Sequence, residues 1–246
     1  EQFKIMEVKH PGRIDMGIGR SPSFKNVNEA LNEFKTQKPK LSQQIDDLNK
    51  YFTNDTIHSH RFKTLEATPY TEHSPEMFIL VMSEQSAELA AKKGLPFVIA
   101  HMGQSHANLT HVIQHYKSRF TEYHGHSHSP YIILATFVVT AENELTIKQL
   151  VDTLNLWLIR INYLKQPKVY PSIETAQQRH YSERDREKIE KNKRRMISGL
   201  PHEVAQQLIQ LQNEFEVDEI MILPNVYGHT HRTKLIELIA HACLDN

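Results

Sequence analysis

The sequence of 246 residues contains one cysteine, Cys243, and no surplus of charge of either sign. A single cysteine excludes a disulfide framework and a zinc site built from cysteines. Lysine plus arginine and aspartate plus glutamate number 29 each, which argues against a nucleic-acid-binding protein that relies on net positive charge. Mean hydropathy is −0.53 and no apolar run approaches the ~20 residues that span a bilayer, so we expect a soluble protein without a membrane partner. The lack of a secretory signal favours the cytoplasm.

Three common site motifs are also missing. No Gly-x-Gly-x-x-Gly follows an expected strand, and the sequence has neither a Walker loop nor a Gly-x-Ser-x-Gly nucleophile motif. These absences argue against a standard dinucleotide fold, a P-loop enzyme and a serine hydrolase.

What the sequence does have is a series of short apolar runs that alternate with helical patterns. Runs such as Met77–Met82 are typical of strands buried on both faces of a parallel sheet. We expect five strands, near residues 14, 78, 98, 132 and 220. We expect helices over residues 1–9, 27–34, 41–52, 87–93, 107–116, 145–163, 183–195, 201–215 and 234–242. Strands separated by helices predict parallel βαβ units and an α/β fold.

Two long stretches, 53–76 and 164–200, interrupt this pattern. Connections of such length are uncommon unless they are functional, so we expect them to form loops or lids of a single domain spanning residues 1–246. A complete (β/α)₈ barrel typically needs about 250 residues. Five strands in 246 residues therefore indicate an incomplete barrel.

The carboxyl ends of parallel strands are where ligands bind. Ser83–Ser86 follows the second expected strand and opens a helix, so its backbone N–H groups and the helix dipole suit an anion. Arg20, at the end of the first strand, has the geometry to clamp a phosphate. The residues alone leave open that Ser83 only caps the helix and that Arg20 only forms a surface ion pair. His101 ends the third strand, as either a core histidine or a ligand contact.

Histidines are plentiful, at 16. His124, His126 and His128 alternate in what we expect to be a loop that leads into a strand at its amino end, the wrong side for barrel chemistry. We therefore interpret them as solvated, and expect His229 and His231 to open the final connection and to cap the closing helix. The stretch 183–195 is basic but also acidic, which is typical of a solvated helical face.

Three segments together resemble one known family. They are His10–Arg20 (HPGRIDMGIGR), Ser86–Phe97 (SAELAAKKGLPF) and Val204–Leu223. His10–Arg20 resembles the fourth-strand motif of the bacterial-luciferase-like flavin-dependent monooxygenases, and the other two resemble later units of the same family. The resemblance runs over the whole chain, although 53–76 and 164–200 match weakly.

This resemblance implies a luciferase-like TIM barrel of which the chain holds strands 4 to 8, without the first three βα units. It implies an enzyme that uses reduced, non-covalent FMN and molecular oxygen on a small organic substrate such as an aldehyde. A separate NAD(P)H flavin reductase would supply the reduced flavin. The implied cofactor-binding residues are Arg20, Met82, Ser83, Glu84, Gln85 and His101. Glu84 departs from the family pattern because it adds a negative charge beside the phosphate, so we expect its carboxylate to point away.

Other interpretations stay open at this stage. A non-catalytic flavin-binding or scaffold protein is one, because an open barrel exposes two sheet edges that need a partner. A histidine-based metal protein is another, although we expect no metal site. The catalytic residues, the substrate and the oligomeric state, a homodimer included, are not fixed by the sequence.

Overall fold

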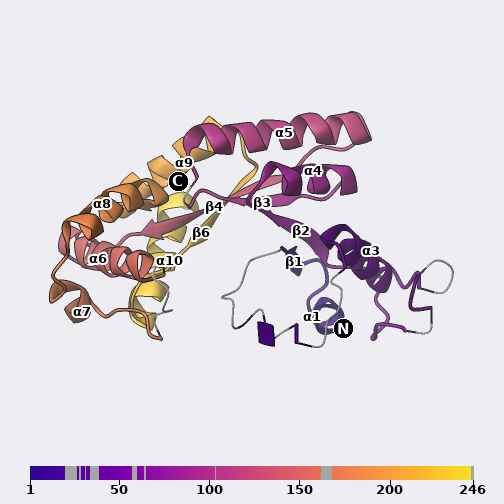
Figure 1. Ribbon diagram of the computed structural model, residues 1–246, viewed down its shortest axis with the longest axis horizontal. Coiled ribbons are helices and arrows are strands. Elements are labelled where there is room, and N and C mark those ends of the chain that lie inside the picture. Colours follow the sequence, from indigo (N-terminus) through magenta and orange to yellow (C-terminus); the bar gives the residue numbers. More distant parts are fainter. Residues whose placement is uncertain are drawn as a thin grey trace. The chain divides into compact units, whose positions relative to one another are not determined.

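A computed structural model describes residues 1–19, 27, 29–30, 32–33, 39–56, 60–63, 65–102, 104–161 and 168–244. Helices and strands alternate along the chain, as the colours of Figure 1 show. The chain forms two compact units, the first made of residues 1–98 and 115–130, the second of residues 99–114 and 131–246. We describe each unit by itself. The prediction of one barrel domain stays a prediction.

The first unit opens with α1 (Gln2–Lys9), β1 (Asp15–Ile18) and α3 (Leu41–Phe52). It continues with β2 (Glu76–Val81) and α4 (Glu84–Lys93). β1 and β2 are parallel, in a register that places Asp15 opposite Glu76 and Ile18 opposite Ile79. The apolar residues of α3 recur at helical spacing, and Leu41, Ile45 and Phe52 are buried.

Two elements run from one unit into the other: β3 (Phe97–Ala100) and α5 (His106–His124). In the first unit the N–H of Ile79 on β2 donates to the carbonyl of Pro96, just before β3 (3.0 Å). In the second unit the N–H of His101, just after β3, donates to Ala135 on the following strand (2.8 Å). α5 is longer than the predicted 107–116, because the helical pattern continues through Phe120 to His124.

The second unit contains β4 (Ile132–Val139), α6 (Glu144–Arg160), α7 (Ile173–Gln177), α8 (Glu183–Asn192), the 3₁₀ turn η1 (Lys193–Arg195), β5 (Met196–Ser198), α9 (Pro201–Phe215), β6 (Glu219–Leu223) and α10 (His229–Leu244). α6, α7 and α8 lie together in Figure 1. β4 pairs in parallel with β5 through Phe137–Val139 and with β6 through Ile133–Phe137. Within the sheet β4 therefore neighbours β3, β5 and β6.

The five predicted strands are all present, and the parallel α/β prediction is confirmed. A sixth strand, β5, was not predicted, because its three residues are too short to show a periodicity. The predicted helix at 183–195 is confirmed as α8 and η1, whereas the one at 27–34 lies largely outside the described residues. α10 begins at His229, five residues before the predicted start.

The prediction of strands buried on both faces was wrong in two places. Leu80 on β2 is 49% exposed, and no residue of β6 is fully buried. Apolar composition alone does not report burial, since much of the surface of any protein is apolar. None of the helices in the described part of the chain combines the length and the apolar character that a membrane crossing requires.

Candidate functional site

The turn between β2 and α4 is a well-formed helix start. Ser83 is the N-cap residue with extended backbone (φ −150°), and its Oγ accepts from the N–H of Ser86 at 3.4 Å. The two hydroxyl oxygens of Ser83 and Ser86 lie 3.2 Å apart. At the other end Gly94 adopts φ +65°, the left-handed conformation that glycine favours in a C-cap. The predicted cap is thus confirmed, and the turn is exposed, with Met82 at 60%.

This turn keeps room for an anion. Among the described residues the backbone N–H of Gln85, at the second position of α4, has no hydrogen-bond partner. Open N–H groups and the positive end of the helix dipole favour phosphate oxygens at such a position. Arg20, predicted to complete the clamp, lies outside the described residues.

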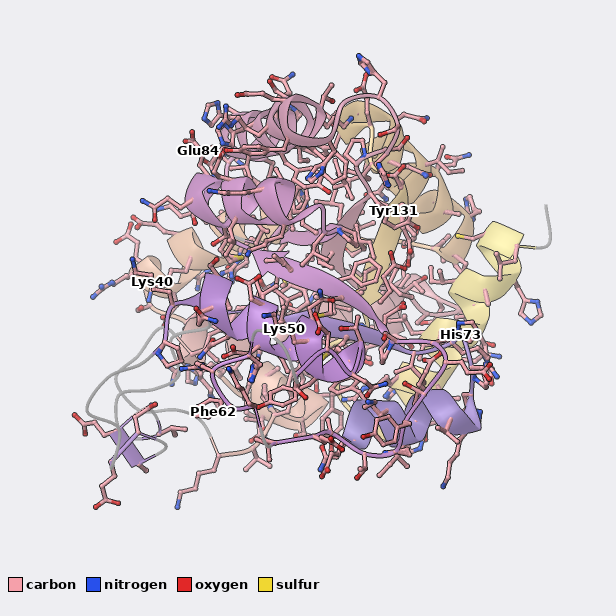
Figure 2. The ribbon with its side chains drawn as sticks, turned by 90° about the vertical axis from the view of Figure 1, so that its right-hand side faces the viewer. Lys40, Lys50, Phe62, His73, Glu84 and Tyr131 are labelled. Carbon is pink, nitrogen blue, oxygen red and sulfur yellow. The ribbon has the colours of Figure 1, made fainter. Side chains whose placement is uncertain are left out.

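The carboxylate of Glu84 is engaged with α5. Its Oε1 lies 3.5 Å from Nδ1 of His115, and Figure 2 labels Glu84 at the start of α4. This contact turns the negative charge of Glu84 towards α5. The expectation that Glu84 turns away from the helix N-terminus agrees with this contact.

A second carboxylate, Glu88, fastens α4 to the same stretch of α5. Arg119 donates to it from Nε (2.8 Å) and Nη2 (2.9 Å), and the hydroxyl of Tyr123 donates at 2.5 Å. Nε2 of His115 lies 3.0 Å from Glu88. The guanidinium of Arg119, followed by Tyr123, lowers the pKa of Glu88 to about 2. This network holds α4, and with it the Ser83 turn, against the second half of α5.

In the second unit His101 is held by one polar contact. Its Nδ1 lies 3.2 Å from the hydroxyl oxygen of Thr136 on β4, while its Nε2 has no partner among the described residues. Burial lowers the pKa of His101, and the carboxylate of Glu214 opposes this shift in part. His101 is therefore a neutral, half-buried imidazole at pH 7 with one ring nitrogen open. Both interpretations offered from the sequence, core histidine and ligand contact, are compatible with this arrangement.

The structure corrects the prediction for one of the remaining histidines, His124. His124 is not in a loop: it ends α5, and its Nε2 donates to the carbonyl of Ala91 at 2.8 Å. His126 and His128 are exposed, and no group of three or more metal-binding side chains occurs among the described residues. His229 and His231 make local helical contacts at the start of α10, to Thr233 and to the Tyr227 carbonyl.

Two features of the candidate site were not predicted from the sequence. Thr136 is fully buried in the otherwise apolar strand β4, so a lone polar residue in a buried run was the signal that could have found it. The pairing of Glu84 and Glu88 with His115 and Arg119 joins residues about thirty positions apart and leaves no local pattern.

Comparison with known proteins identifies the family to which this chain belongs. Residues 1–215 match the family model described as luciferase-like monooxygenase. YceB of Bacillus subtilis (strain 168) is 30% identical over 246 residues, which cover 99% of this chain and 73% of YceB. The chain therefore belongs to the luciferase-like monooxygenase family, and the resemblance drawn from its motifs is confirmed.

Two solved structures share the fold. The crystal structure of apo-MsnO8 has a TM-score of 0.74 and 22% identity, over 98% of this chain and 71% of MsnO8. The oxygenating constituent of 3,6-diketocamphane monooxygenase from the CAM plasmid of Pseudomonas putida, solved in complex with FMN, has a TM-score of 0.60 and 14% identity. That match covers 94% of this chain and 70% of the other. At such identities these likenesses concern the fold alone.

Proposed function

We propose that this chain is an FMN-dependent monooxygenase that uses reduced flavin and molecular oxygen on a small organic substrate such as an aldehyde. The family membership supports an oxidoreductase. The observation that carries the flavin assignment is the start of α4, which combines exposed Ser83, an open N–H at Gln85 and a Glu84 carboxylate drawn to His115.

These residues fit a phosphate group. Ser83 and Ser86 offer hydroxyl donors, and Met82 and Gln85 flank the turn as the other proposed contacts. Without the contact to His115, the Glu84 carboxylate would be free to repel a phosphate at the same helix end. Arg20 is our proposed bidentate partner on the phosphate.

In the second unit we propose His101 as a contact to the flavin ring. An imidazole kept neutral by burial can donate or accept one hydrogen bond through Nε2 without adding charge. Bound reduced FMN would supply the reaction with oxygen, and the protein supplies binding, orientation and exclusion of water. A separate NAD(P)H flavin reductase would deliver the reduced flavin. Residues 53–76 and 164–200 are our proposed lids.

Flavin binding tests this proposal. Quenching of FMN fluorescence should give saturable binding to the wild-type chain, and Arg20→Ala should weaken it at least tenfold, a loss of about 1.4 kcal/mol. Arg184→Ala, which removes an exposed arginine of α8, is the matched control and should leave the affinity within twofold.

Turnover separates the alternatives. With reduced FMN in air, an aldehyde should be converted to an oxygenated product faster than in the absence of protein. FMN binding without any product would favour the non-catalytic flavin-binding protein. No binding at millimolar FMN, together with identical behaviour of Arg20→Ala and wild type, would contradict both.

A further inference from the structure

The second unit contains a basic cavity that the proposed flavin contacts do not use. It has a volume of about 330 Å³ and lies between the start of α5 and the segment formed by α8 and η1. Its lining consists of Gln104, Ser105, Lys188, Lys191, Asn192, Arg194 and Arg195. Four of these seven described residues are cationic and none is acidic.

Two of the four cationic side chains are not neutralised by described residues. In the described part of the chain neither Lys191 nor Arg194 has an ion pair or hydrogen bond from its side chain. The nearby carboxylate of Glu190 pairs instead with Lys193, at 2.8 Å, and Lys193 does not line the cavity. Positive charges gathered in one cavity repel one another, and an anion between them removes that repulsion.

Asn192 is a buried residue of this lining with one open donor among the described residues. It is 4% exposed, its Oδ1 accepts from Nη1 of Arg195 at 3.3 Å, and its Nδ2 has no partner among the described residues. The accepted bond fixes which way the amide faces, so the group left over is a donor. A buried donor without an acceptor costs about 1–3 kcal/mol.

Arg195 is a second residue of the lining with a buried donor that lacks an acceptor in the described part of the chain. Its Nε is buried without a partner among the described residues, and burial lowers the pKa of its guanidinium. An arginine stays charged at any ordinary pH, so this burial is a cost that an anion would offset.

The start of α5 completes the lining. Ser105 caps the helix, because its Oγ accepts from the N–H of Asn108 at 3.2 Å and its carbonyl accepts from the N–H of Leu109. The positive end of a 19-residue helix therefore faces the same cavity. Among the described lining residues, the buried side-chain atoms without a partner, Asn192 Nδ2 and Arg195 Nε, are both donors.

We propose that this cavity is a binding site for a phosphate group, either free phosphate or the phosphate of a small monoester. Asn192 Nδ2 and Arg195 Nε donate to the phosphate oxygens, and Lys191 and Arg194 close over it from the exposed side. A dianion is favoured over a carboxylate because its interaction with four positive charges is larger. The site is built from residues other than those proposed for the flavin phosphate.

Calorimetric titration in a phosphate-free, low-salt buffer tests the site, with inorganic phosphate and glycerol phosphate as separate probes. Wild type should bind at least one of them, and the tighter of the two identifies the source. Lys191→Gln combined with Arg194→Gln should weaken that binding at least tenfold, since both side chains are exposed and their loss leaves the fold intact. Lys193→Gln, a neighbouring exposed lysine outside the cavity, should stay within twofold.

A second variant introduces a negative charge into the cavity itself. Asn192→Asp puts a carboxylate beside Arg195 and should abolish phosphate binding while the chain stays folded. Three results would overturn the proposal: equal phosphate binding by wild type and the double variant, acetate binding as tight as phosphate, or an equal loss of FMN affinity in the double variant. The last result would mean that the cavity holds the flavin phosphate, whereas loss of FMN binding in Arg20→Ala alone bears only on the flavin proposal.

Discussion

Three donors from α5 converge on the single carboxylate of Glu88 on α4: Arg119, Tyr123 and His115. Arg119 is the main cause of the low pKa of about 2, against an ordinary 4.5. Since the folded chain holds this carboxylate ionised to lower pH than the unfolded chain does, the network stabilises the fold fully above about pH 5. That contribution falls as the pH drops from 4.5 towards 2.

Glu88→Gln removes the charge and keeps the shape of the side chain. We expect a loss of about 1–2 kcal/mol in the free energy of unfolding at pH 7, the range for charge-assisted hydrogen bonds that are partly open to solvent. The difference from wild type should shrink steadily between pH 5 and pH 3, and urea unfolding at several pH values measures it. Glu122→Gln is the control, because Glu122 contacts the same arginine from an exposed position and should cost less than about 0.5 kcal/mol. A constant difference over this pH range would contradict the assignment.

β5 is the shortest strand in the described part of the chain. It has three residues, and the segment is tied back at Gly199, whose N–H donates to Val139 (3.3 Å) and whose carbonyl accepts from the hydroxyl of Thr140 (2.7 Å). Thr140 is 1% exposed, so loss of its hydroxyl leaves a carbonyl without a partner.

Thr140→Val should therefore cost about 1–3 kcal/mol and loosen β5 locally. Amide hydrogen exchange at Ile197 and Ser198 should quicken at least tenfold in this variant, whereas Thr140→Ser should leave the exchange nearly unchanged. Equal exchange rates in wild type and Thr140→Val would show that the strand pairing alone holds β5.

The contrast between α4 and β5 explains what the sequence could predict. The start of α4 is set by Ser83 and its end by Gly94, both local signals, and the helix predicted over 87–93 is present as Glu84–Lys93. β5 depends on a threonine about sixty residues away, and no window of neighbouring residues contains that information.

The same distinction applies to the candidate sites. A serine at a helix start was visible in the sequence, and so was a histidine at a strand end. The contact of His115 with Glu84 and the buried amide of Asn192 were not visible in the sequence, since both arise from tertiary packing. The mixed charges at 183–195 were interpreted as a solvated face, and the structure corrects this in part: four cations from that stretch, Lys188, Lys191, Arg194 and Arg195, line a cavity.

At the scale of the whole molecule, the charge balance governs how copies of the chain behave towards one another. Acidic and basic residues cancel at 29 each, and the sequence pI is about 7.5. Near this pH no net repulsion separates molecules that carry exposed apolar side chains such as Met82, Ile209 and Leu244. The 16 histidines change this balance on mild acidification, because an ordinary histidine has a pKa near 6.5.

We expect solubility to be lowest near pH 7.5 and to rise several-fold by pH 5.5, where the net charge reaches on the order of +10 or more. Light scattering and the salt concentration needed for precipitation, followed across this range, measure the effect. Added sodium chloride should reduce the gain at pH 5.5, since it screens the repulsion between molecules. His126→Gln with His128→Gln is the control: two exposed histidines of 16 supply a small share of the charge, so the profile should keep its shape. A solubility minimum at pH 5.5, or a profile abolished by these two substitutions, would mean that local contacts rather than the distributed charge govern self-association.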